Sequence, residues 1–279
     1  MEDINKDNVR EYLLEKFGDI NFIEESHQYF IDKNEYTPVS HIIKEYEVFV
    51  DWDLKAENYA KKYGRKKEDV QKEWKLNNLK STISGTRIHE FGESYTNLLI
   101  GHPELICENN KRQYIEEYNT LIPICSKEES IKMFYDDLND FDMFKLKPIG
   151  SEIKLSTKYI ECARPICGTC DLLLYGEDAL FSENDGFVLG DWKTNKSLYN
   201  DYNRRFKVKM KYPFNNLIDE SFSHYIIQFN LYRRMLESVG VKIVDMVLIW
   251  LKDFGYEKIK VPMIENEIID MIIMKKKMS

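Results

Sequence analysis

Two charged residues at the end of an apolar run are the first feature of this chain that could do chemistry. Asp191 and Lys193 close the segment 187–194, whose apolar and small residues predict a strand. Side chains two positions apart in a strand point to the same side of a sheet, so the two charges would lie together. Mg²⁺ prefers carboxylate oxygens, and a neighbouring lysine can position an attacking water and offset the charge on a phosphoryl group. The pair therefore favours metal-assisted hydrolysis, with a surface ion pair as the alternative.

A second carboxylate, Asp171, stands where a glycine-containing turn meets the apolar strand of residues 166–175. On a strand next to Asp191, it would complete a cage of two carboxylates and one lysine around a cation. The alternative role for Asp171 is to cap the turn, which is a frequent use of aspartate.

A helix-forming segment offers a histidine to the same site. His89 and Glu93 are four residues apart and would share one helix face, with Ser84 or Thr86 as the predicted N-cap. Histidine binds transition metals and can stand beside Mg²⁺ or Mn²⁺, whereas a lone helical histidine is more often a core or surface residue.

A later helix, predicted over residues 223–238 and ended by Gly240, carries Gln228 and Tyr232 on one face. Both side chains can hydrogen-bond to phosphate or sugar oxygens, and the tyrosine ring can stack on a base. A polar stripe with an amphipathic tyrosine is the alternative interpretation.

These residues must be held by a sheet with helices around it. Beyond the segments named above, the sequence predicts helices at 7–18 and 52–80, a helix capped by Ser40, a hairpin within 21–37, a mainly helical lobe at 110–145 and a strand at 149–156. The continuous apolar run 246–251 predicts a strand buried on both faces. This order predicts an α/β fold, with a central mixed sheet flanked by helices, a helical N-terminal part and a helical insertion.

The composition is that of an ordinary globular protein, with 43% hydrophobic and 32% charged residues among 279. No stretch is long and apolar enough to cross a bilayer, and the polar start of the chain has no signal-peptide core, which predicts an intracellular protein. A net charge of -8 argues against a general nucleic-acid coat but not against an enzyme that needs carboxylates. Two basic tracks, residues 61–67 and 204–211, are either solvated faces or candidate phosphate contacts, with Arg204 and Arg205 foremost.

Five cysteines, at positions 107, 125, 162, 167 and 170, are predicted to be reduced thiols. Cys162, Cys167 and Cys170 have the close spacing of a metal cluster. The sequence supplies no obvious fourth ligand for zinc, so buried thiols are the favoured interpretation.

In chain order the motifs are Gly85-Thr86-x-x-His89-x-x-x-Glu93, Glu152, Gly168-x-x-Asp171, Asp191-x-Lys193-Thr194 and Gln228-x-x-x-Tyr232. This series resembles the RecB-type branch of the PD-(D/E)XK nuclease superfamily. The hairpin with His27-x-Tyr29 and the segment 38–43 also resemble the lead-in of phage and mitochondrial exonucleases in that branch. The resemblance covers residues 22–251.

The resemblance implies a restriction-endonuclease-like core that binds one or two Mg²⁺ or Mn²⁺ ions. The implied metal ligands are His89, Asp171, Asp191 and the backbone carbonyl of Trp192, with Lys193 as the catalytic lysine. Gln228 and Tyr232 would hold the substrate strand, and Glu93 and Glu152 match acidic positions that support the site or face the substrate. Some relatives carry an iron–sulfur cluster on one cysteine before the histidine helix and three after the Gln/Tyr helix. That pattern is absent here, so no cluster is expected.

One nuclease domain is expected over residues 1–279, with an N-terminal hairpin and helices in 1–80, a catalytic core in 84–251 and a tail in 252–279. The implied activity is a DNA exonuclease in which metal-activated water attacks the phosphodiester in line. Linear, preferably single-stranded DNA is the expected partner, with no membrane and with a recombination protein as a further candidate. The expected setting is phage or bacterial recombination or repair in the cytoplasm, rather than mitochondria.

Two other functions fit the same motifs. A structure-selective or nicking endonuclease would share every one of them, and a catalytically inactive nucleic-acid-binding module would share the fold. No residue can be assigned to reading a 2′-hydroxyl, so the motifs do not separate DNA from RNA.

Overall fold

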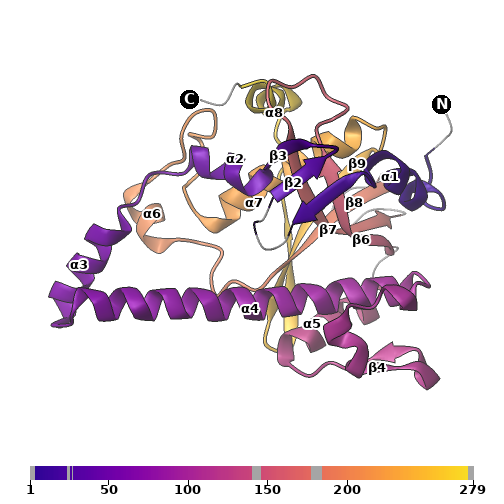
Figure 1. Cartoon of the computed structure of the whole chain (residues 1–279), viewed down its shortest axis with the longest axis horizontal. Coiled ribbons are helices and arrows are strands. Elements are labelled where there is room, and N and C mark those ends of the chain that lie inside the picture. Colours follow the sequence, from indigo (N-terminus) through magenta and orange to yellow (C-terminus); the bar gives the residue numbers. More distant parts are fainter. Residues whose placement is uncertain (1–3, 24–25, 27, 140–145, 177–183, 276–279) are drawn as a thin grey trace.

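A mixed sheet of eight strands runs through the centre of the protein (Figure 1). The computed structural model describes residues 4–23, 26, 28–139, 146–176 and 184–275. The strands of the sheet are β1 (Ile20–Ile23), β2 (Gln28–Ile31), β3 (Asn34–Pro38), β6 (Leu146–Ser156), β7 (Ile166–Gly176), β8 (Gly186–Lys193), β9 (Ile243–Lys252) and β10 (Gly255–Lys260). Their order is β1-β2-β3-β7-β8-β9-β10, and β6 pairs with β7. The β3–β7 and β8–β9 pairs are parallel and the others antiparallel, which confirms the predicted α/β class.

Helices pack on both faces of this sheet. The α-helices are α1 (Val9–Phe17), α2 (Val39–Tyr46), α3 (Trp52–Tyr63), α4 (Lys67–Leu99), α5 (Ser126–Asn139), α6 (Asp201–Phe206), α7 (Ser221–Glu237) and α8 (Asn266–Ile273). Among the described helices, none combines the length and the apolar character that crossing a membrane requires.

The two faces of the sheet carry separate hydrophobic cores, because strand side chains alternate. On β7, Leu173 belongs to a core that includes residues of α1, α2, α7 and α8. Its neighbours Leu172 and Leu174 belong to the core that includes α4 and α5. The same alternation on β9 buries Met246 on the first face and Val247 on the second, so the continuous apolar run is buried on both faces as predicted.

The strands predicted at 149–156, 166–175 and 187–194 are confirmed as β6, β7 and β8. The predicted hairpin is formed by β2 and β3, and β1 adds a third strand to it. His27, which the hairpin was expected to include, lies outside the described residues.

The predicted helices at 7–18, 52–80 and 223–238 are also present, with one break. Gly64 ends α3 in a left-handed conformation (φ 61), a conformation that glycine adopts without strain, and α4 begins at Lys67. At the other end of α3, the Asp51 side chain accepts hydrogen bonds from two backbone amides of the first turn.

Both predicted helix caps are wrong. Ser84 and Thr86 lie inside α4, which runs without interruption for 33 residues. Their short polar side chains imitate a helix start, but flanking residues that favour helix carry the backbone through. Ser40 lies in the first turn of α2, which begins at Val39. The residue before it, Pro38, is extended backbone paired with β7, and this pairing sets where α2 begins.

Two predicted regions have a different structure. In the described part of the lobe at 110–145, α5 is the only α-helix. β4 (Tyr114–Ile115) and β5 (Thr120–Leu121) form a small sheet bordered by short 3₁₀ helices, and residues 140–145 lie outside the described part. The segment 252–279, expected to be a tail, forms β10 and α8. β10 forms an antiparallel hairpin with the preceding strand β9, across the two residues Asp253 and Phe254.

The long helix α4 crosses the sheet at one end and leaves it at the other, as Figure 1 shows. Residues from Ile88 to Leu98 include most of its buried side chains, whereas no residue in 71–87 is buried. At its start, Val70 packs with Ala56 and Ala60 of α3. A solvated helical stretch about 25 Å long therefore joins a small α3–α4 contact to the body of the protein.

Candidate active site

Three carboxylates lie side by side on three adjacent strands. In the β6–β7 register Ser151 pairs with Leu172 and Ile153 with Cys170, so Glu152 and Asp171 lie between these two pairs, opposite each other. The β7–β8 pairing ends one residue short of Asp171 and Asp191, which brings those two side chains together. Directly opposed residues of antiparallel strands share a face, so all three carboxylates point the same way.

His89, which α4 contributes, lies beside these carboxylates. Its Nδ1 lies 2.9 Å from Oδ2 of Asp171. One ligand atom each from His89, Glu152 and Asp171 lies within 4.8 Å of the other two, a spacing that could hold a metal ion. Glu152, expected only in a supporting or substrate-facing role, thus enters the candidate metal group. Its place depends on the register between two strands, for which the sequence carries no local signal.

Asp191 and Lys193 lie close together, as their spacing of two residues along a strand predicts. Nζ of Lys193 lies 2.7 Å from Oδ1 of Asp191, and both side chains are largely buried. The same ammonium lies 4.6 Å from the centre of the Tyr225 ring on α7. Tyr225 is a site neighbour that sequence reasoning missed, although it stands three residues before Gln228 and so near the same helix face.

Gln228 and Tyr232 of α7 are joined to each other, since Nε2 of Gln228 donates to the Tyr232 hydroxyl over 3.2 Å. The Tyr232 ring is buried against β7, where a Cβ added to Gly168 would lie 2.5 Å from it. A buried ring has no free face for a base. Tyr232 therefore supports Gln228 and β7, and the stacking role expected for it does not fit this position.

Trp192 lies between Asp191 and Lys193 and points to the opposite face. Its indole is buried in the α4–α5 core, where a Cβ added to Gly92 of α4 would lie 2.8 Å from Nε1. This contact sets the distance between α4 and β8. The role expected for the backbone carbonyl of Trp192 as a metal ligand stays a prediction.

The buried charged groups of the site shift one another's pKa values. Burial alone would raise the pKa of Asp171, but the nearby His89 and Lys193 hold it below its usual range. Burial, followed by repulsion from Asp171, raises the pKa of Glu152 and of Asp191 well above the usual values. Burial opposes the charged forms of His89 and Lys193, yet the neighbouring carboxylates raise the pKa of both.

This donor set fits a hard divalent cation. Oδ2 of Asp171 and Oδ1 of Asp191 are buried, and neither accepts a well-aligned hydrogen bond from a described residue, although His89 and Lys193 lie at ion-pair distance. Carboxylate oxygens crowded in this way repel each other until a cation stands between them. Mg²⁺ or Mn²⁺ would suit the oxygens, and Mn²⁺ the added imidazole nitrogen.

The remaining sequence-predicted residues lie outside this cluster. Glu93 accepts a hydrogen bond from Sγ of Cys107 over 3.2 Å, and burial raises the pKa of its carboxyl group. The Arg204 guanidinium is paired with Glu220, with Nη2 2.8 Å from Oε1, so its charge is already neutralised. Arg205 is exposed on the short helix α6 and keeps its candidate role in phosphate contact.

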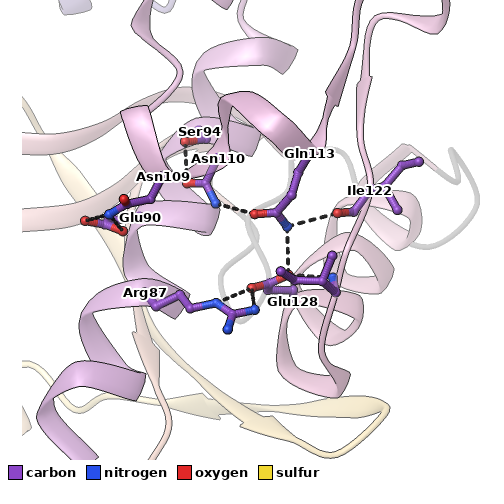
Figure 2. A network of polar contacts seen from close by, with 9 residues as sticks. Arg87, Glu90, Ser94, Asn109, Asn110, Gln113, Ile122 and Glu128 are labelled. Atoms are coloured by element: carbon purple, nitrogen blue, oxygen red, sulfur yellow. Dashed lines mark hydrogen bonds and ion pairs between the residues drawn. The ribbon is translucent and has the colours of Figure 1, made fainter.

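A buried polar network fixes α4 close to His89 (Figure 2). Glu128 of α5 is fully buried and accepts hydrogen bonds from Nη2 of Arg87 and Nε2 of Gln113, each over 2.9 Å. The network continues from Gln113 through Asn110 to Ser94 of α4. Because Arg87 stands two residues before His89, these bonds hold the histidine-bearing turn against α5.

All five cysteines are free thiols. Cys167 and Cys170 are buried, and burial raises the pKa of Cys167 to about 12. A thiol with so high a pKa is protonated at neutral pH and is a poor metal ligand.

No protein-family model matches this chain, and no curated protein matches it. A solved structure of SSO0001 aligns with 97% of this chain and 84% of that chain, at a TM-score of 0.36 and 10% sequence identity. A likeness at that TM-score assigns neither a family nor a function to this chain.

Proposed function

We propose that this chain is a divalent-metal-dependent deoxyribonuclease that hydrolyses phosphodiester bonds at the ends of single-stranded DNA. The observation that carries this proposal is the meeting of a histidine, three carboxylates and a lysine, delivered by α4, β6, β7 and β8. Paired acidic ligands with an adjacent lysine suit an in-line displacement at phosphorus.

A bound divalent cation would supply charge stabilisation at the phosphoryl group and a more acidic water. His89, Glu152 and Asp171 would hold it, with Asp191 beside them. Lys193, kept in place by Asp191, brings a positive charge to the reacting phosphate and can orient the attacking water. Gln228, held by Tyr232, can hydrogen-bond to a phosphate or sugar oxygen of the substrate strand.

The preference for a DNA end is supported by the resemblance of the Gln228-x-x-x-Tyr232 motif to end-processing nucleases. A nicking or structure-selective endonuclease would use the same cluster. The two activities differ in the need for an end, and substrate topology separates them.

The test is a timed digestion of DNA labelled at either end, single- and double-stranded, beside covalently closed single-stranded circles. We expect Mg²⁺ or Mn²⁺ to release nucleotides from linear strands, and EDTA to abolish release. Asp191→Asn and Lys193→Met should each lower kcat/KM at least about 100-fold. Circular dichroism must show that both variants fold, because each leaves a buried charge without its partner.

The matched control is Lys242→Gln. In the parallel β8–β9 register, Phe187 pairs with Ile243, so exposed Lys242 lies at the opposite end of the sheet from Lys193. This variant should keep full activity. Cutting of closed circles would replace the exonuclease with an endonuclease. Metal binding by calorimetry without cleavage of any DNA or RNA would leave only an inactive binding module.

A further inference from the structure

The arm formed by α3 and the solvated part of α4, residues 52–82, differs in charge from the rest of the chain. It contains nine basic and five acidic residues, in a chain whose net charge is -8. Three of the basic residues are neutralised within the arm, Lys61 by Glu57, Arg65 by Glu73 and Lys67 by Asp53.

Four other lysines of the arm have no acidic partner among the described residues. Lys66, Lys72, Lys75 and Lys80 are exposed, and none forms an ion pair with a residue that the structure describes. Unpaired, exposed ammonium groups on an otherwise acidic protein create a local positive field, which attracts a polyanion.

The arm also exposes a connected series of aromatic rings. Trp52 contacts Trp74 edge to face, Trp74 contacts Tyr59, and Tyr59 contacts Tyr63, with ring centres 6.3, 5.6 and 4.5 Å apart. The two end rings are the most open, with Trp52 62% and Tyr63 54% exposed. Lysines lie beside both, because Nζ of Lys55 is 4.4 Å from the centre of the Trp52 ring and Nζ of Lys62 is 5.2 Å from that of Tyr63.

Open rings flanked by lysines match the chemistry of an unpaired nucleic-acid strand. Bases of a single strand can stack on exposed aromatic rings while its phosphates meet nearby cations. In a duplex the bases are already stacked and paired, so the rings would have no base face to meet. A protein partner would use the apolar rings but would not require the surplus of lysines.

The position of the arm connects this surface with the candidate active site. On α4, Lys75, Asn78, Thr82 and His89 are separated by three, four and seven residues, so they follow one helix face. From Lys75 to His89 the helix rises about 21 Å. A strand held on the arm could therefore follow a polar helix face to the histidine of the site.

We propose that the arm is a binding platform for single-stranded nucleic acid, with bases stacked on Trp52 and Tyr63 and phosphates beside Lys66 and Lys75. The path along α4 to His89 rests on the proposed nuclease function, whereas binding by the arm does not. The arm is thus a second contact with the strand, away from the reacting phosphate.

The test measures equilibrium binding of a fluorescein-labelled deoxythymidine oligonucleotide by anisotropy, in EDTA so that no cleavage occurs. We expect Trp52→Ala and Tyr63→Ala each to weaken binding about tenfold. In Lys66→Gln and Lys75→Gln, the slope of log affinity against log salt should become shallower by about 0.7 each. Binding should quench the fluorescence of Trp52. We therefore expect the total tryptophan fluorescence to fall less on binding in Trp52→Phe than in the wild type.

Two matched controls separate the arm from general effects of ring or charge loss. Tyr118 is 69% exposed and follows β4, which lies far from α3 in Figure 1. Tyr118→Ala and Lys242→Gln should bind as the wild type does. Circular dichroism and thermal melting check that the arm variants keep their helices.

Each outcome has one meaning for the arm. Weaker binding by the ring variants with unchanged controls supports the platform, even if no nuclease activity is ever found. Unchanged binding by the ring and lysine variants overturns it, even if the protein cleaves DNA. Equal affinity for duplex and single strands, or no binding by the wild type, also overturns it.

Discussion

Glu152 combines an unfavourable backbone conformation with a carboxyl group that is crowded by other charges. Its backbone has a φ of 49°, a left-handed conformation that non-glycine residues seldom adopt and that costs about 1–3 kcal/mol. Burial of its carboxyl group and repulsion from the neighbouring Asp171 both raise the pKa of Glu152. Burial and repulsion of the charge indicate that the metal-free protein is less stable with an ionised Glu152 than with a neutral side chain there.

Replacing Glu152 with glutamine should therefore raise the melting temperature of the metal-free protein at neutral pH. The pKa of Glu152 is higher in the folded state, so the ionised group destabilises the fold as pH rises above its unfolded pKa of about 4.3. Glutamine removes this effect, and its advantage should vanish below about pH 4, where glutamate is protonated in both states. Thermal melting in EDTA across this pH range measures it.

The same variant tests the metal role. A ligand at 100 times its Kd adds about 2.7 kcal/mol to the stability of a protein that binds it only when folded. We expect Mn²⁺ to stabilise the wild type and to stabilise Glu152→Gln markedly less. Glu161→Gln, at an exposed position, is the control. Equal stabilisation of the wild type and Glu152→Gln would remove Glu152 from the ligand set.

Among the elements, α4 has the strictest positional demand, because it carries His89 and must approach β8 closely. Two glycines of this helix, Gly85 and Gly92, have different surroundings. A Cβ at Gly92 would lie 2.8 Å from the buried Trp192 ring, whereas a Cβ at Gly85 would lie 3.8 Å from Oγ1 of Thr194, an ordinary contact. The same substitution should therefore have opposite effects at the two positions.

Gly92→Ala should lower stability by about 1–3 kcal/mol, because the added methyl group overpacks the contact with Trp192. It should also lower kcat/KM by moving His89, one turn away, relative to Asp171. Gly85→Ala should instead add about 0.5–1 kcal/mol, the usual gain of alanine over glycine inside a helix. Denaturant unfolding of both variants measures the difference. Equal effects would show that the contact between Gly92 and Trp192 does not set the helix position.

For the molecule as a whole, the sequence predicted what local patterns determine. Continuous apolar runs located β7, β8 and β9, and a period of two placed Asp191 and Lys193 together. The place of Glu152 depends on the pairing of β6 with β7, which has no local signature in the sequence. β10 was missed although it follows β9 directly in a hairpin, because residues 255–260 contain no continuous apolar run.

Helix boundaries were missed for a related reason. The segment around Ser84 and Thr86 has the composition of a helix start, yet α4 continues through it. Its N-terminal end is held by packing of Val70 on α3 and its C-terminal end by the sheet core. Contacts at both ends keep the middle helical, and these contacts are visible only in the fold.

This division of α4 predicts uneven stability along one continuous helix. Amides in 88–98 lie in the sheet core and should exchange hydrogen only through global unfolding, whose free energy is typically about 5–15 kcal/mol. No residue in 71–87 is buried, so local opening should expose the amides there at a much smaller free energy. Hydrogen exchange followed by mass spectrometry can resolve the two stretches, with the buried strand β9 as the internal reference. Addition of a single-stranded oligonucleotide in EDTA should slow exchange in 71–87 and leave β9 unchanged, because β9 carries none of the residues that we propose to contact the strand. Equal protection of both stretches in the free protein would mean that 71–87 is covered in solution, and the arm would then not be an open surface.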